Sequence, residues 1–205
     1  MDTINGFQGE YRFLSNFYPC RITFYGLTFT SVEAAFQAAK CADPHKRSLF
    51  CDLSAADAKR LGRSVVLRKD WEQRKMIIMY NLLVHKFYEN PELLGRLLAT
   101  GTVPLVESNT WHDNFWGNCT CSRCSRIDGQ NRLGLLLMEI RSSFEAKSHM
   151  PSRDILHRCP RKENLANCFD CSDHLRCSLF RFFLKHYTPT FDAAKFHAMQ
   201  SEKGE

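Results

Sequence analysis

The segment Ser31–Lys40, SVEAAFQAAK, joins a helix-start signal to a run of small residues. Thr30 and Glu33 have the spacing of a capping box, in which a Thr side chain and a Glu three residues later satisfy each other's backbone donors. The alanines that follow favour a helix that packs closely against its neighbours. We therefore predict a helix from about Ser31 to Cys41.

Three polar residues lie on one face of this predicted helix. Glu33, Gln37 and Lys40 recur at i, i+4 and i+7. On most helices such a face is simply solvated. Here no other charge occurs between residues 31 and 41, which favours a buried helix that places an acid and an amine in a pocket.

Signals for further elements occur on both sides of this helix. Residues 20–29 alternate apolar and polar side chains around Gly26, as expected for a hairpin. Capping residues, helical periodicity and turn signals predict helices over 54–61, 71–88, 91–99 and 131–146, and a short strand over 104–107. In the last helix we expect Leu135, Leu136, Met138 and Ile140 to face the core. The predicted fold is α+β and predominantly helical, with a small N-terminal sheet.

The composition is that of a globular protein. The chain has 205 residues, of which 44% are hydrophobic and 24% charged, unlike disordered, collagen-like or coiled-coil sequences. There is no apolar run of ~20 residues and no secretory signal in residues 1–5, so we expect a cytoplasmic protein, or a nuclear one in a eukaryote, without a membrane partner. The length fits one domain, 1–150, with an extension, 151–205. The sequence does not give the oligomeric state.

Two later segments concentrate residues typical of binding sites. Glu107–Gly117 crowds aromatic and ionisable side chains into one loop, where they either stack on flat ligands or plug the core. Gly129–Gly134 precedes an apolar helix, and the start of a helix can bind phosphate, although Asn131 can equally serve only as the N-cap.

These segments belong to an ordered series of blocks that resembles the NADAR superfamily of YbiA-like N-glycosidases. The resemblance covers about residues 5–146. The blocks are Phe13–Pro19, Ser31–Lys40, Leu67–Glu72 with Lys75, Lys86–Phe87, Leu97–Gly101, Trp111–Gly117 and Asn131–Gly134. The sequence departs from the short bacterial members in an insertion at 118–128 and after about residue 146.

The resemblance implies a NADAR-type α+β fold and an enzyme that hydrolyses N-glycosides of ribose without a metal or cofactor in the reaction. Two substrate classes are associated with the family: ADP-ribose linked to guanine of nucleic acid, and a phosphorylated ribosylamino-pyrimidine from riboflavin biosynthesis. The matching positions are Glu33, Lys40, Asp113, Trp116 and Asn131, with Arg12 and Asn16 near the first block.

The chemistry of ribosyl C–N cleavage requires a carboxylate near the sugar and a proton donor for the leaving base. We expect Glu33 to act as acid/base at the anomeric carbon and Asp113 to orient the substrate or water. Lys40 either donates hydrogen bonds to ribose or phosphate, or attacks the anomeric carbon as a desolvated amine. The expected substrate-binding residues are Arg12, Asn16, Gln37, Trp111, Trp116, Gly117, Asn131 and Gly134.

The predicted function is removal of ADP-ribose from guanine bases of nucleic acid or nucleotides, which would reverse DNA ADP-ribosylation. The mild net charge of +6 and the Arg- and Cys-rich extension favour this substrate over a small metabolite. The alternatives are an N-glycosidase of riboflavin biosynthesis and a non-catalytic reader of ADP-ribose or nucleotides.

Seven of the ten cysteines fall into two groups. Cys119, Cys121 and Cys124 form C-x-C-x2-C, three of the four ligands of a structural zinc, with His112 or a distant cysteine as the fourth. The extension contains a complete set with a C-x2-C pair, which fits zinc or an iron–sulfur cluster, with His157 and His174 as substitute ligands. That set is Cys159, Cys168, Cys171 and Cys177. Unliganded thiols are the alternative for both groups.

Overall fold

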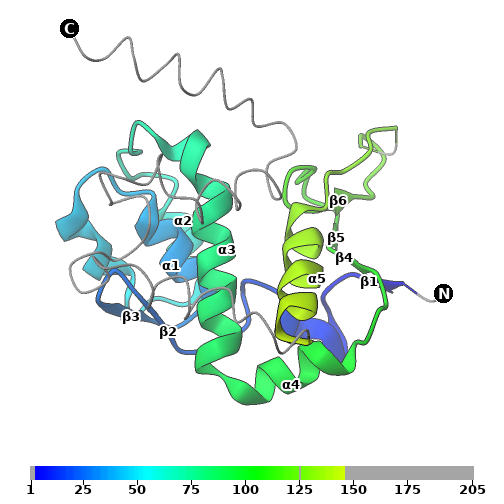
Figure 1. The fold of residues 1–205 in the computed structure, drawn as a ribbon. Helices are drawn as coiled ribbons and strands as arrows, with labels where there is room; N and C mark the ends of the chain where they lie inside the picture. The colour runs from blue at the N-terminus through cyan, green and yellow to red at the C-terminus, as the bar shows by residue number, and fades with distance from the viewer. Residues whose placement is uncertain (1–2, 125, 146–205) are drawn as a thin grey trace, which may run out of the picture. The chain divides into compact units, whose positions relative to one another are not determined.

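The computed structural model describes residues 3–124 and 126–145, which form a predominantly helical α+β fold (Figure 1). The extension 151–205 and its cysteines lie outside the described residues. In chain order the elements are β1 (Ile4–Asn5), η1 (Gly9–Leu14), β2 (Ile22–Phe24), β3 (Leu27–Phe29), α1 (Val32–Ala39), η2 (Pro44–Phe50), α2 (Ala55–Leu61), α3 (Trp71–Glu89), α4 (Pro91–Ala99), β4 (Leu105–Val106), β5 (Ser108–Asn109), β6 (Asn118–Cys119) and α5 (Arg132–Glu145). None of the described helices has the length and apolar character needed to cross a membrane.

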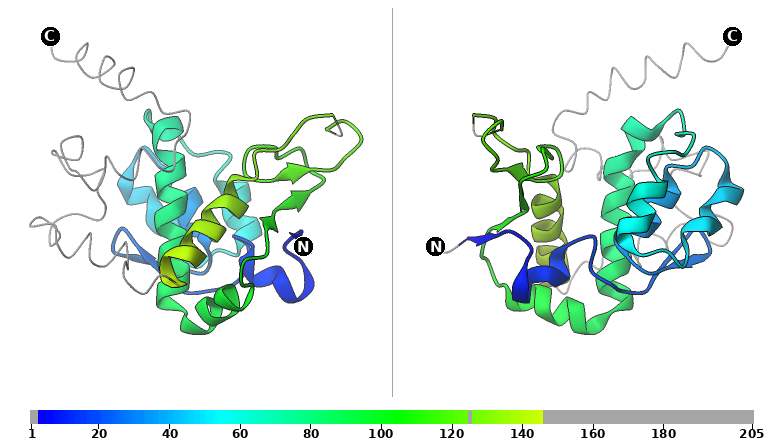
Figure 2. Two further views of the ribbon diagram at one scale, coloured as in Figure 1. Left: turned by 45° about the vertical axis from the view of Figure 1, so that its right-hand side comes forward. Right: turned by 180° about the vertical axis from the view of Figure 1, so that it is seen from behind.

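Helix α3 stands between two groups of elements. Helices α1 and α2, the 3-10 helix η2 and the β2–β3 hairpin lie on one side of α3, and α5 with β4 lies on the other (Figures 1 and 2). Helix α4 closes one end, where it contacts both α3 and α5. The buried side chains Ile78, Leu82, Leu83 and Phe87 of α3 form the core between the two groups.

The strands are short and form separate pairs. β2 and β3 pair antiparallel, with Ile22 opposite Phe29, so the predicted hairpin is confirmed. Its turn contains Tyr25 and Gly26 at φ of 53° and 72°, as the twist of a tight hairpin requires. β1 pairs in parallel with β4, a contact between residues about 100 positions apart that no local pattern predicted.

The start of α1 corrects the predicted capping box. Ser31, not Thr30, is the N-cap, and its Oγ accepts a hydrogen bond from the Ala34 N–H at 3.1 Å. The Thr30 hydroxyl is instead used in a tertiary bond to the Leu53 carbonyl. The Glu33 carboxylate is therefore not needed for capping and is available to the interior.

Helix α5 corrects one residue of the predicted core. Leu136 and Ile140 are buried as expected and Met138 is half-buried, but Leu135 is 55% exposed, and Leu133 and Leu137 are fully buried in its place. The apolar face therefore follows positions 133, 136, 137 and 140, and Leu135 lies on the opposite side of the helix. The other predicted helices are present with boundaries within a residue or two, whereas η1 and η2 were not predicted.

Candidate active site

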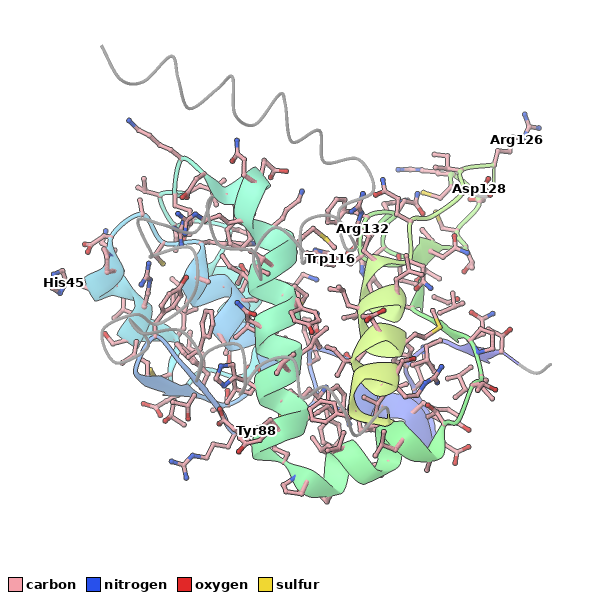
Figure 3. All side chains as sticks on the ribbon, in the orientation of Figure 1. His45, Tyr88, Trp116, Arg126, Asp128 and Arg132 are labelled. Atoms are coloured by element: carbon pink, nitrogen blue, oxygen red, sulfur yellow. The ribbon has the colours of Figure 1, made fainter. Side chains whose placement is uncertain are left out.

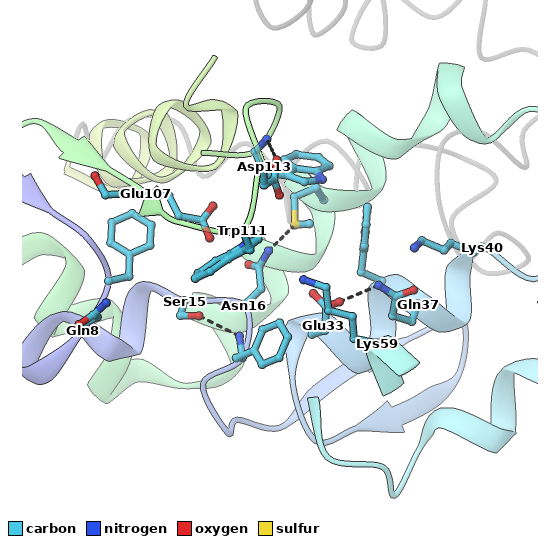
Figure 4. A pocket seen from close by; sticks show the side chains of 16 residues that line it. Gln8, Ser15, Asn16, Glu33, Gln37, Lys40, Lys59, Glu107, Trp111 and Asp113 are labelled. Atoms are coloured by element: carbon cyan, nitrogen blue, oxygen red, sulfur yellow. Dashed lines mark hydrogen bonds between the residues drawn. The ribbon is translucent and has the colours of Figure 1, made fainter. Parts of the chain in front are cut away.

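A cavity of about 550 Å³ lies between α1 and the segment that runs from β4 to β6 (Figure 4). Its volume is within the range of roughly 300–1,000 Å³ that is typical of small-molecule sites. Residues just before and just after η1, together with Lys59 of α2 and Met79 of α3, complete the wall. The predicted site residues that line it are Asn16, Glu33, Gln37, Lys40, Trp111, Asp113 and Trp116.

Helix α1 places the carboxyl group of Glu33 in this cavity. Glu33 is only 6% exposed, and its Oε1 accepts a hydrogen bond from Gln37 Nε2 at 2.7 Å, one helical turn away. Burial raises the pKa of Glu33, and the hydrogen bond from Gln37 opposes this shift only in part. The Glu33 N–H donates to the Asn16 carbonyl at 3.0 Å, which links α1 to the segment that carries Asn16.

Lys40 ends α1 beside two aromatic rings. Its Nζ lies 5.8 Å from the ring centroid of Phe36 and 5.7 Å from that of Trp71. Burial lowers the pKa of Lys40, while the nearby Glu33 carboxylate opposes the shift. A larger fraction of this amine is therefore uncharged than in an exposed lysine, which the expected attack on the anomeric carbon requires and hydrogen-bond donation does not.

The opposite wall is a loop fixed by hydrogen bonds. Asp113 Oδ1 accepts the N–H groups of Phe115 at 3.0 Å and Trp116 at 2.8 Å, which hold the carboxylate in place. The buried Asn109 accepts the N–H groups of Trp111 and Asp113, both at 3.2 Å, and donates to the Asp113 carbonyl at 2.7 Å. The loop therefore presents Trp111 and Asp113 to the cavity in a defined arrangement.

The rings of this loop also join the two sides of the fold. Trp116 packs edge-on against Phe36 of α1, with centroids 5.6 Å apart. Two cations lie close to the ring centroid of Phe115, Lys75 of α3 at 3.9 Å and Arg132 of α5 at 4.7 Å. The aromatic residues thus both line the site and anchor it.

Two charged residues of the cavity were not predicted. Burial, followed by the negative charge of Asp113, raises the pKa of Glu107 to about 7, although Lys59 opposes this shift. Lys59, in the last turn of α2, lies 5.2 Å from the ring of Phe17 at the cavity wall. The sequence placed Glu107 at the end of a predicted strand and at the start of the loop rich in aromatic and ionisable residues, but gave it no role, and Lys59 had no sequence signal.

Three oxygen atoms of the cavity residues are buried without a hydrogen-bond partner among the described residues. They are Asn16 Oδ1, Gln37 Oε1 and Glu107 Oε2. Buried acceptors in folded proteins are nearly always satisfied, so each such atom calls for an explanation. Gln37 Oε1 faces Gly62, so its closest packing is with α2 rather than with the cavity.

Some predicted binding residues do not line this cavity, namely Arg12, Gly117, Asn131 and Gly134. Arg12 is exposed on η1. The Asn131 side chain accepts the Glu107 N–H at 2.9 Å and donates to the Leu105 carbonyl at 2.8 Å, so it holds the strand before the site. A Cβ at Gly134 would lie 2.2 Å from the Leu105 carbonyl oxygen, and one at Gly117 would lie 2.3 Å from that of Glu107. These glycines permit close backbone contact behind Glu107.

Comparison with known proteins identifies this architecture. The sequence profile of the NADAR domain matches residues 5–145. N-glycosidase YbiA of Escherichia coli strain K12 is 39% identical over 149 residues, which cover 70% of this chain and 89% of YbiA. A riboflavin biosynthesis protein of Vibrio vulnificus is 36% identical over 68% of this chain, but over only 36% of its own length. The NMR structure of Escherichia coli YbiA superimposes with a TM-score of 0.61 at 37% identity and covers 72% of this chain and 89% of that protein.

The match to N-glycosidase YbiA over most of both chains shows that the protein is an enzyme, a hydrolase that acts on N-glycosyl bonds. The chain belongs to the NADAR domain family and has a YbiA-like fold.

Proposed function

We propose that the protein hydrolyses the N-glycosidic bond that joins ADP-ribose to a guanine base of nucleic acid. Two carboxyl groups with raised pKa values, Glu33 and Glu107, carry the proposal, because one can donate a proton and the other can accept one. The acidic groups stand in the same cavity, as bond cleavage at the ribose requires.

Cleavage breaks the bond between the anomeric carbon and the base nitrogen, and the electron pair leaves with the base. The base then needs a proton, and water adds to the sugar and loses one. Glu107, whose pKa is about 7, donates the proton to the leaving base. Glu33 receives the proton of the attacking water, and Asp113, held by two backbone N–H groups, orients the substrate.

The two lysines of the cavity recognise or activate the sugar phosphate. Lys59 on α2 and Lys40 on α1 place cationic groups in the cavity wall, where a diphosphate would bind. Lys40 has a second role open to it, attack on the anomeric carbon to form an imine with the opened ribose. In either case the proposed reaction uses these side chains and water, without a metal or cofactor.

The exposed Trp111 at the cavity and the charge of the chain favour nucleic acid over a small metabolite as the substrate. Trp111 lines the cavity yet is 58% exposed, so its ring is open to stacking on a base. The net charge of +6 and the arginine-rich extension favour a polyanion. The extension itself lies outside the described residues.

A second candidate function is hydrolysis of a phosphorylated ribosylamino-pyrimidine. The observation that favours it is the 36% identity to a protein named for riboflavin biosynthesis. The same acids and lysines would serve this reaction, because both substrates contain a ribosyl C–N bond and a phosphate.

A comparison of substrates tests the proposal. The full chain is incubated with DNA and RNA oligonucleotides that carry ADP-ribosyl-guanine, and with the phosphorylated ribosylamino-pyrimidine. We expect release of ADP-ribose from the oligonucleotide by the wild type, loss of at least 100-fold in rate for Glu33→Gln, and no loss for Glu92→Gln on the exposed face of α4. Hydrolysis of the pyrimidine substrate alone would establish the second function. Tight binding of ADP-ribose without product would show a reader.

A further inference from the structure

A histidine and three cysteines converge in the segment between β5 and the loop after β6. They are His112, Cys119, Cys121 and Cys124, and one ligand atom from each lies within 4.8 Å of all the others. The imidazole Nδ1 is 3.2 Å from Cys121 Sγ and 3.4 Å from Cys124 Sγ. The three thiols are free rather than joined in disulfides. Arg126 and Asp128 mark the outer end of the same segment, far from α3 (Figure 3).

These separations suit one tetrahedral ion. With Zn–S bonds of about 2.3 Å and Zn–N bonds of about 2.05 Å, a regular tetrahedron has S···S edges of about 3.8 Å and S···N edges of about 3.6 Å. The two S···N separations in the structure are within a few tenths of an ångström of that value. Three thiolates and one imidazole are a ligand set that selects zinc over the hard cations, which prefer oxygen.

The backbone already holds the four side chains in this arrangement. The Cys124 N–H donates to the Cys121 carbonyl at 3.0 Å, which forms the turn that brings their thiols together. The His112 N–H donates to Cys119 Sγ at 3.3 Å, and the Cys119 N–H donates to Asn114 Oδ1 at 2.9 Å. The ligand atoms are therefore gathered by hydrogen bonds that a metal would not need to displace.

We infer that His112, Cys119, Cys121 and Cys124 bind one structural zinc ion. The sequence spacing gave the three cysteines and left the fourth ligand open between His112 and a distant cysteine. The structure brings His112 to that position. This inference does not depend on the proposed substrate, because its measurements concern the metal.

The site also positions the active-site loop. His112 has a φ of 68°, a left-handed conformation that is costly for a residue other than glycine. Its neighbours Trp111 and Asp113 both line the cavity. Coordination of His112 holds the backbone in this conformation, with the histidine on the metal and the two neighbours in the cavity wall. The four ligands are thus positioning residues.

Metal analysis of the full chain, purified under reducing conditions with zinc supplied, tests the inference. We expect Cys121→Ser to contain one zinc equivalent less than the wild type. The matched control is Cys51→Ser, a half-buried free thiol at the end of η2, which should leave the zinc content unchanged. Equal zinc in Cys121→Ser and wild type would overturn the inference, as would a wild-type protein with no zinc or with iron in its place.

Cobalt substitution provides a readout that does not depend on the stability of Cys121→Ser. A four-serine chain with Cys159→Ser, Cys168→Ser, Cys171→Ser and Cys177→Ser lacks the cysteine set of the extension. Its Co²⁺ form should show the visible absorption of a tetrahedral thiolate site. His112→Cys in this background should keep the ion and add thiolate-to-cobalt charge-transfer intensity, whereas His112→Ala should weaken binding by at least tenfold. No tetrahedral spectrum in the four-serine chain would refute the site.

Discussion

Replacement of Glu107 by glutamine tests both the assigned proton donor and the cost of burying it. The carboxyl is buried, its Oε2 has no partner among the described residues, and its pKa is raised to about 7 by burial and by Asp113. A proton donor must be protonated, so we expect the wild-type rate of hydrolysis to fall as the pH rises above 7. Glu107→Gln should lose most of this activity and the alkaline limb of its pH profile, because the amide has no acidic proton.

The raised pKa of Glu107 also predicts that Glu107→Gln is more stable than the wild type. A carboxyl whose pKa is higher in the folded than in the unfolded state binds more protons when folded, so its contribution to stability falls as the pH rises from 4.5 to about 7. A difference between 4.5 and about 7 corresponds to about 3 kcal/mol at most. Glu107→Gln should thus be more stable than the wild type by about 1 kcal/mol at pH 5 and by up to about 3 kcal/mol at pH 8.

Urea denaturation followed by tryptophan fluorescence between pH 5 and pH 8 measures this difference. Glu92→Gln, on the exposed face of α4, is the control and should follow the wild type at each pH. If the difference in unfolding free energy between Glu107→Gln and wild type is the same at pH 5 and pH 8, the raised pKa is wrong. In that case Glu107 is not the proton donor.

Three further perturbations probe other parts of the site. A Cβ on Gly62 would lie 1.9 Å from Gln37 Oε1, so Gly62→Ala should break the hydrogen bond from Gln37 to the Glu33 carboxyl and lower kcat at least tenfold. Gly95→Ala, with open space around it, should leave kcat unchanged. Equal kcat in both variants would count against a positioning role of Gln37. Sodium borohydride added during turnover should reduce the imine between Lys40 and the opened ribose to a secondary amine, which mass spectrometry detects. Turnover without an adduct would leave Lys40 with the role of a hydrogen-bond donor. Burial lowers the pKa of Lys86 to about 8, so between pH 8 and 10.5 the unfolded chain binds more protons than the folded one. The free energy of unfolding of the wild type should therefore rise by up to about 3 kcal/mol over this range. Lys86→Met should show no such rise in urea denaturation.

The sequence predicted one wall of the site well because that wall is local. Glu33, Gln37 and Lys40 share a face at helical spacing, and the scarcity of other charges indicated that this face is buried. Both features are independent of the rest of the chain. The helix was misjudged only at its cap, where the Thr30 hydroxyl is bound to the Leu53 carbonyl, a tertiary contact without a local signature.

Glu107 was missed because its environment is assembled from distant segments. The parallel pairing of β1 with β4 sets the strand that leads to it, and Asn131 binds its N–H from 24 residues further along. Its raised pKa comes first from burial, which that stretch of sequence does not reveal, and then from Asp113, six residues further along the same loop. Asn131 was predicted as a binding residue through the resemblance, and the structure assigns its amide to backbone contacts.

The two walls of the cavity differ in what holds them, and this difference has a consequence for function. The α1 wall is part of the apolar core, since every residue from Val32 to Ala39 is buried. The wall from β4 to β6 has two-residue strands and is held by the side chains of Asn109 and Asn131 and by the cysteine group around His112. Polar contacts and a metal site are directional, whereas apolar packing is not. Changes in the second wall should therefore displace Asp113 and Glu107 before they unfold the core, so activity should be lost at smaller perturbations than global stability.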